Sequence, residues 1–144
     1  MRVLLDTSCL VAAASAQHEH HRATIADLCH RRAAGHIFVL ASHGLLEAYS
    51  VLTRLPPPHR LSPGDALTLL DRNWGDAETI ALTAAESWRA LRELAGAGIG
   101  GGRIHDGCIA ASARKGKCDE ILTWNARHFA GLPGPRAVAP SEPV

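Results

Sequence analysis

The sequence is short of aromatic residues, which make up only 4% of its 144 residues. Alanine is abundant in their place, so we expect a hydrophobic core built from aliphatic side chains. Hydrophobic residues account for 47% of the chain and charged residues for 20%, which is typical of a soluble globular protein. A chain of this length is the size of one compact domain, which can bury a core without a disulfide or a structural metal.

The sequence also lacks any apolar run approaching the roughly 18 residues of a membrane-spanning helix. Met1 leads directly into a predicted strand, without the segments of a signal peptide. We therefore expect a cytoplasmic protein with no membrane contact. An excess of charge is missing too, since 15 Lys and Arg against 14 Asp and Glu give a net charge of +1. Any surface that binds nucleic acid must then be local.

The four cysteines are scattered, and none forms a CxxC pair. Each lies in or beside a predicted helix or strand, so we expect buried free thiols rather than disulfides or zinc ligands. The segment HEHH, residues 18–21, raises the question of zinc again. His18 and His21 have no evident third ligand and no cysteine at a ligand spacing, so we interpret them as surface histidines that face solvent or RNA.

Short apolar runs alternate with helical patterns along the chain. Strands are predicted at 3–5, 37–40, 79–82, 120–123 and 136–139, helices at 9–14, 18–34, 42–55, 61–73, 83–95 and 106–115, and a short helical turn at 125–129. The glycine-rich stretch GAGIGGG, residues 96–102, is predicted to be a mobile loop. Apolar strands alternating with helices indicate an α/β domain with a mostly parallel sheet, in which ligands bind beyond the carboxyl ends of the strands.

Three acidic residues each have a local explanation. Asp6 ends the apolar run VLLD, and Asp commonly caps the helix that follows. Glu47 shares a polar stripe of its helix with His43, and such a stripe is usually a solvent-exposed face. Asp106 begins its predicted helix, where a negative charge complements the helix dipole. Taken one at a time, none of the three needs a catalytic role.

The combination of these residues is more informative, because their order and spacing resemble those of the PIN domain family, and within it the VapC-type toxins of bacterial toxin–antitoxin pairs. The stretches that carry the resemblance are VLLDTSCL, SAQHEHHRA, LASHGLLEAYSVLTRLP and RIHDGCIAASARKGKCDEILTWNARHF. They extend over essentially the whole chain. The resemblance implies a single three-layer α/β/α domain over residues 1–140, with a central, mostly parallel sheet of four or five strands, and a short polar tail at 141–144.

The resemblance further implies a metal-dependent endoribonuclease that cleaves structured RNA, such as tRNA or rRNA, with a metal-activated water. Its implied Mg²⁺ ligands are Asp6, Glu47 and Asp106, and Mn²⁺ can substitute for Mg²⁺. Three carboxylates at close quarters repel one another, and a bound cation removes that repulsion. Asn125 stands where many PIN domains have a fourth Asp, and its amide brings no charge. Because of its position we assign Asn125 to the catalytic set. Because it brings no charge, we expect at most one tightly held metal.

Other residues are assigned supporting roles around this site. Thr7 and Thr123 match the family's hydroxyl positions, which suit hydrogen bonds to the carboxylates, although N-capping explains both equally well. His105 neighbours Asp106 and suits a role beside a metal ligand or at a phosphate. The basic residues expected to rim the site and to contact RNA are Arg103, Arg114, Lys115 and Arg127.

Two other interpretations compete with this one. A haloacid-dehalogenase-type phosphatase also has an Asp after its first strand, but it needs a second Asp two residues later, where this chain has Ser8. A catalytically weak or inactive PIN-fold interaction module stays open, because the fourth carboxylate is missing. For the VapC-type toxin, the resemblance implies a small VapB-type antitoxin as partner and a homodimer.

Overall fold

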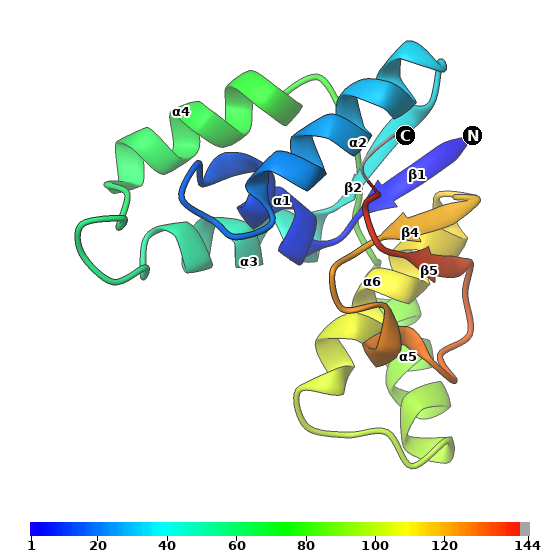
Figure 1. Cartoon of the computed structure of the whole chain (residues 1–144). Helices are drawn as coiled ribbons and strands as arrows, with labels where there is room; N and C mark the ends of the chain where they lie inside the picture. The colour runs from blue at the N-terminus through cyan, green and yellow to red at the C-terminus, as the bar shows by residue number, and fades with distance from the viewer. Residues whose placement is uncertain (142–144) are drawn as a thin grey trace.

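The computed structural model describes residues 1–141 (Figure 1). The predicted tail at 141–144 therefore lies outside the described residues, except for Ser141. The strands of this range form one sheet and are β1 (Arg2–Leu5), β2 (Ile37–Ala41), β3 (Glu78–Ile80), β4 (Glu120–Leu122) and β5 (Arg136–Val138). Their order across the sheet is β3-β2-β1-β4-β5, and every neighbouring pair is parallel. The predicted fold class is confirmed.

Helices cover both faces of the sheet. One side carries α1 (Thr7–Ala14), α2 (His21–Ala33), α3 (Ser42–Leu52) and α4 (Pro63–Trp74), and the other carries α5 (Ala84–Gly96), α6 (Arg103–Lys115) and the 3₁₀ turn η1 (Ala126–Phe129) (Figure 1). Successive side chains of a strand point to opposite faces. Val3 and Leu5 accordingly join the core beneath α1–α4, whereas Leu4 joins the core beneath α6. The apolar run of β1 thus supplies both cores.

Five helices begin at residues other than those predicted, and of these α4 and α5 begin only two residues and one residue late. α1 begins at Thr7 rather than at residue 9, because the Asp6 carbonyl already accepts the N–H groups of Cys9 and Leu10. α2 begins at His21 rather than at 18, because His18 Nδ1 accepts a hydrogen bond from the backbone N–H of His20 in a preceding turn. α6 begins at residue 103 rather than at 106, which shortens the glycine-rich loop.

The cysteines agree only in part with the prediction of buried free thiols. All four cysteines are free, and Cys9 is buried as predicted. The prediction of burial is wrong for Cys29, which lies on the outer side of α2 next to the buried Leu28. Among the helices within residues 1–141, none combines the length and the apolar character needed to cross a membrane.

A buried ion network ties α2 to the sheet. Glu120 of β4 is only 6% exposed, and its carboxylate accepts hydrogen bonds from Arg31 at 2.9 Å and from Arg136 at 2.7 Å. Arg31 also donates to the buried Asp27 at 2.7 Å. Burial acts to raise the pKa of Glu120, but the two guanidinium groups outweigh it and hold that pKa below its usual value.

Replacing Arg31 with Met should lower the free energy of unfolding by about 3 to 5 kcal/mol, because it leaves the buried Asp27 without its cation and leaves Glu120 with Arg136 alone. The pKa of Glu120 is lower in the folded than in the unfolded protein. Its contribution to the free energy of unfolding is therefore fully present above the unfolded pKa. That contribution is lost as the pH falls through the folded pKa. The cost of Arg31→Met should therefore shrink in acid. Urea denaturation at several pH values measures both effects.

Arg114→Met is the matched control, because Arg114 pairs with Glu93 at 2.9 Å where both side chains are substantially exposed. An exposed ion pair contributes little to stability, so this variant should lose much less. Equal losses in the two variants at neutral pH would contradict a stabilising role for the buried network.

Candidate active site

The carboxyl ends of β1 and β4 meet at the centre of the sheet. The chain builds outward from β1 through β2 and β3 and then returns to place β4 on the other side of β1, so the strand order reverses between β1 and β4. Open parallel sheets bind ligands at such a point. Asp6 follows β1 and Thr123 follows β4. The Asp6 N–H donates to the Leu122 carbonyl at 3.0 Å, which extends the strand pairing up to the acidic residue.

Two hydroxyl groups hold the carboxylate of Asp6. This residue occupies the N-cap position of α1, but its side chain makes no capping hydrogen bond. Its Oδ2 instead accepts hydrogen bonds from Thr123 Oγ1 at 2.7 Å and from Ser8 Oγ at 2.9 Å, and the residue is only 5% exposed. Its Oδ1 accepts none of the hydrogen bonds found within residues 1–141. That oxygen remains available to a cation or a water.

A third hydroxyl group holds Glu47. Thr7, the first residue of α1, donates from Oγ1 to Glu47 Oε2 at 2.9 Å. The close approach of α3 depends on Gly44, where a Cβ would lie 3.1 Å from Ile109 Cδ1 and 3.4 Å from Thr7 Oγ1. Glu47 consequently lines a cleft beside Asp6 instead of lying on an open solvent-facing stripe.

Asp106 approaches the same cleft from the first turn of α6, and no side chain caps that helix. The pKa of Asp106 is raised, chiefly by burial and then by the negative charges of Asp6 and Glu47. His128, whose Nδ1 lies 3.8 Å from Asp106 Oδ2, and Arg103 act in the opposite direction. Asp106 is therefore electrostatically coupled to Asp6 and Glu47, and His128 and Arg103 offset the repulsion only in part.

The cleft has a volume of about 660 Å³ and brings together the four predicted catalytic residues. Asn125 lines it next to Thr123, whose Oγ1 accepts the Asn125 backbone N–H at 3.0 Å. The other polar residues of the lining are Thr7, Ser8, His18, Arg103, His105 and His128. Carboxylates, hydroxyls and histidines thus surround one open, polar space.

The structure does not bring all the predicted RNA contacts to this cleft. Arg114 and Lys115 lie in the last turn of α6, and Lys115 is about 13 Å along the helix axis from Asp106. They form ion pairs with Glu93 and Glu86 of α5 at 2.9 and 2.8 Å. Proximity in the sequence was misleading here, because a helix carries its two ends apart.

The remaining two predicted RNA contacts lie nearer the site. Arg103 lines the cleft, and its guanidinium donates to the carbonyls of His128 and Ala130 at 3.3 and 2.9 Å. Arg127 is exposed on η1, beside His128. Arg103 thereby connects the start of α6 with the turn that follows β4.

The donor set suits a hard, hydrated cation. The three carboxylates share one cleft, yet their oxygens are not gathered into a closed cage: within residues 1–141, the group of His, Cys, Asp or Glu ligand atoms that all lie within 4.8 Å of one another is His43, Glu47 and His105. Mg²⁺ keeps several waters and usually binds protein through one or two carboxylates. The residues Asp6, Glu47 and Asp106 therefore fit a hydrated Mg²⁺.

Sequence reasoning overlooked two residues of this region. Ser8 helps to hold Asp6, and its Oγ also accepts the Trp124 backbone N–H at 3.0 Å. Its position two residues after Asp6 was the available signal. His43, which was interpreted as part of a solvent-exposed stripe, faces His105 across the gap between α3 and α6. Its spacing of four residues from Glu47 places both on one helix face.

Comparison with known proteins bears on this geometry. The family model of the PIN domain matches residues 3–133. The chain belongs to the PIN domain family. This PIN domain is 37% identical over 123 residues to Ribonuclease VapC27 of Mycobacterium tuberculosis (strain ATCC 25618 / H37Rv), which covers 85% of the chain and 84% of the relative. Ribonuclease VapC40 of the same strain is also 37% identical over 123 residues, covering 85% of each protein.

Solved structures share the fold of this PIN domain. The crystal structure of VapBC2 from Rickettsia felis, bound to a DNA fragment from its promoter, matches with a TM-score of 0.71 at 20% identity, over 96% of this chain and 98% of that one. VapC20 of Mycobacterium tuberculosis, a sarcin-ricin loop cleaving toxin, matches with a TM-score of 0.69 at 18% identity, over 90% and 95%. At these identities the likeness supports the α/β/α architecture alone.

Replacing Asp106 with Asn should raise the melting temperature of the metal-free PIN domain at neutral pH. Burial and the neighbouring carboxylates raise the pKa of Asp106, so the folded protein bears the cost of ionising it and an amide avoids that cost. The pKa of Asp106 is higher in the folded than in the unfolded protein. The free energy of unfolding of the wild type therefore falls as the pH rises from the unfolded pKa to the folded one. Thermal melts with a chelator, at neutral pH and below both pKa values, test whether the advantage of the variant disappears in acid.

Asp65→Asn is the control. Asp65 lies in the first turn of α4, as Asp106 does in α6, but Asp65 is exposed whereas Asp106 is partly buried. Removing its charge takes away a favourable interaction with the helix dipole and should slightly lower the melting temperature. A lower melting temperature for Asp106→Asn than for the wild type at neutral pH would contradict the proposed repulsion.

Proposed function

We propose that this PIN domain is a Mg²⁺-dependent endoribonuclease, the toxin of a VapBC-type toxin–antitoxin pair, which cleaves structured RNA such as tRNA or rRNA. The observation that carries the proposal is the convergence of Asp6, Glu47 and Asp106 on one cleft, at the point where the strand order reverses. The names of the curated relatives, Ribonucleases VapC27 and VapC40, support RNA as the substrate. One similar structure is that of a toxin that cleaves the sarcin-ricin loop, which supports a structured RNA.

The roles of the cleft residues follow from their contacts. Asp6, Glu47 and Asp106 would hold Mg²⁺, with Mn²⁺ as a substitute. When bound, the ion would lower the pKa of a water and offset negative charge on the scissile phosphate. Thr123 orients Asp6, whose Oδ2 it fixes. Asn125 adds a polar side chain without charge, which favours one tightly held ion over two.

Phosphate binding is assigned to the arginines that lie near the cleft, Arg103 and Arg127. Backbone phosphates supply most of the affinity of nucleic-acid complexes and make it sensitive to salt. Arg114 and Lys115 are left out of this proposal, because their ion pairs with α5 already engage their charges. His105 and His128 line the cleft and are suited to contact the same backbone.

A cognate VapB-type antitoxin and a second copy of the chain are the proposed protein partners. Structures similar to this one include VapBC assemblies from Rickettsia felis and Salmonella typhimurium. An apolar groove of about 350 Å³ runs between α3 and α4, and two of its leucines, Leu46 and Leu67, are 69% and 63% exposed. Exposed apolar surfaces of this kind are typical of protein interaction sites.

Replacing Asp6 with Asn should reduce Mg²⁺-dependent cleavage of RNA by at least about 100-fold, because a divalent cation stabilises the transition state by several kcal/mol. Purified wild type and variant are incubated with tRNA and rRNA fragments in Mg²⁺, and the products are separated on a gel. A chelator should abolish cleavage by the wild type. Asp65 lies on α4 and does not line the cleft, so Asp65→Asn should cleave as the wild type does.

The same assay separates the endoribonuclease from an inactive interaction module. Cleavage by Asp6→Asn at the wild-type rate would contradict the assignment of Asp6 to the catalytic site. A wild type that binds these RNAs but cuts none of them, with either Mg²⁺ or Mn²⁺, would favour the module instead.

Replacing Thr123 with Val should weaken Mn²⁺ binding by about 10- to 100-fold, the usual effect of losing a group that orients a metal ligand. The change keeps the shape of a fully buried side chain and removes the hydroxyl that donates to Asp6. Calorimetric titration with Mn²⁺ measures the affinity, and Thr123→Ser, which retains the hydroxyl, is the matched control. Unchanged affinity in Thr123→Val would show that Asp6 needs no such orientation.

A further inference from the structure

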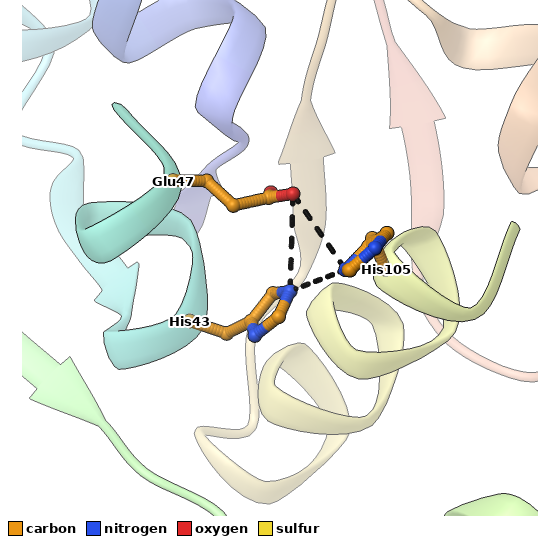
Figure 2. Close-up of side chains that lie close together, drawn as sticks. All are labelled: His43, Glu47 and His105. Atoms are coloured by element: carbon orange, nitrogen blue, oxygen red, sulfur yellow. Dashed lines mark hydrogen bonds and ion pairs between the residues drawn. The ribbon is translucent and has the colours of Figure 1, made fainter. Parts of the chain in front are cut away.

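Two histidines and a glutamate converge beside the cleft. Figure 2 shows His43 and Glu47 extending from α3 and His105 from α6, with the three side chains directed toward one another. His43 Nε2 lies 2.9 Å from His105 Nδ1. Glu47 Oε1 lies 3.6 Å from His105 Nδ1 and 3.9 Å from His43 Nε2. One potential ligand atom from each residue therefore occupies a corner of a small triangle.

The dimensions of this triangle match the ligand shell of zinc. Four ligands bound at about 2.0–2.1 Å in a tetrahedron lie about 3.3 to 3.4 Å from one another. A tetrahedral ion lies about 0.7 Å out of the plane of three of its ligands, and a point so placed and equidistant from the three atoms lies about 2.1 to 2.2 Å from each, close to the length of a zinc–ligand bond. Small adjustments of the side chains therefore suffice to accommodate an ion.

The chemistry of the donors selects the same class of ion. Imidazole nitrogens suit zinc and neighbouring transition metals, whereas Mg²⁺ prefers oxygen ligands and many waters. Two histidines and one glutamate, with a fourth position open to water, form a recurrent zinc ligand set. The side chains of His43, Glu47 and His105 are 38%, 34% and 52% exposed, so an ion can enter from solvent.

The surroundings prepare Glu47 for this role. Thr7 donates to Oε2 of Glu47, and the oxygen that faces the histidines is the other one, Oε1. The two imidazole rings are stacked, with centroids 5.0 Å apart and planes inclined by 17°, and their facing nitrogens share one hydrogen bond. A metal ion would take the place of that shared proton.

We propose that His43, Glu47 and His105 bind Zn²⁺ in a site that is distinct from the Mg²⁺ site but shares Glu47 with it. Binding of Zn²⁺ is independent of the proposed function. Its consequence rests on that function: an ion that occupies Glu47 withdraws a ligand from Mg²⁺, so Zn²⁺ inhibits the nuclease. Zinc thereby acts as a regulator of the cleft rather than as its catalytic ion.

The other histidine-rich segment of the chain is not the zinc site. His20 is stacked on Trp124, with ring centroids 3.9 Å apart, and His21 Nδ1 is hydrogen-bonded to the Ala12 carbonyl at 2.8 Å. His18 lines the cleft instead of joining them in a ligand group. These contacts use His20 and His21 for packing, which differs from the surface histidines facing solvent or RNA that the sequence predicted.

Calorimetric titration of the metal-free protein with Zn²⁺ tests the proposal. The wild type should bind one Zn²⁺ per chain, and His43→Asn and His105→Asn should each bind it more than about 100-fold more weakly, since losing a ligand costs more than losing a group that orients one. His59→Asn, at an exposed histidine outside the cleft, should bind as the wild type does. Both substituted residues of the site are partly exposed, so the variants should fold, and thermal melts check this.

Co²⁺ provides a second readout that does not depend on activity. Bound in place of Zn²⁺, it should give the intense visible absorption of a tetrahedral complex in the wild type and in His59→Asn, and not in His43→Asn or His105→Asn. Unchanged Zn²⁺ affinity in these two variants, or an equal Co²⁺ spectrum, would overturn the proposal.

Variants of the carboxylates separate the two sites. Asp106→Asn should weaken Mg²⁺ binding and retain Zn²⁺ binding, whereas Glu47→Gln should weaken both. Loss of Zn²⁺ binding in Asp106→Asn as large as in His43→Asn would place zinc among the carboxylates and overturn the proposed site. If the wild type binds Zn²⁺ through the histidines but cuts no RNA, the zinc site stands and only the nuclease assignment fails.

Discussion

The hydrogen bond from Thr123 to Asp6 joins the carboxyl ends of the two central strands, and the cleft is organised around it. Asp6 can be held there because β1 and β4 are parallel neighbours whose ends coincide in register. Hydroxyl groups are suited to this task, since they fix a carboxylate without neutralising it. An acidic side chain is thereby held at a buried position, which is unfavourable for the folded protein alone and useful for holding a cation.

The cost of gathering carboxylates at one end of the sheet contrasts with the opposite end of β4. There Glu120 is equally buried but is paired with Arg31 and Arg136. The same short strand thus begins with a carboxylate whose pKa is lowered by its cations and ends beside a site where burial and neighbouring carboxylates raise the pKa of Asp106. Stability and binding are served by opposite arrangements of the same chemical group.

Much of the fold could be predicted from the sequence, because strands buried on both faces appear as apolar runs and helices between them as periodic patterns. The position of Asp6 could be predicted as well, since it follows a strand and the strand ends of a parallel sheet coincide, whereas Glu47 and Asp106 were placed beside it only by the resemblance to the PIN domain family. Helix starts were less accurate where a side chain competed for backbone N–H groups, as His18 does before α2.

Contacts between separate helices could not be predicted in the same way. The pairing of His43 with His105 depends on how closely α3 approaches α6, which no local pattern encodes. The position of Arg114 away from the cleft could not be predicted for a related reason. Its charge was visible in the sequence, but its partner Glu93 on α5 was not.

Gly44 lies where α3, which carries residues of both proposed metal sites, packs closely on α6. A methyl group at this position would lie 3.1 Å from Ile109 Cδ1, so the Ile109 side chain would have to give by a few tenths of an ångström, whereas 3.4 Å to Thr7 Oγ1 is an ordinary contact. His43 and Glu47 both belong to α3, so any adjustment of this helix at Gly44 moves them together relative to His105 and Thr7. The packing of one glycine against one isoleucine therefore links the two ion sites mechanically.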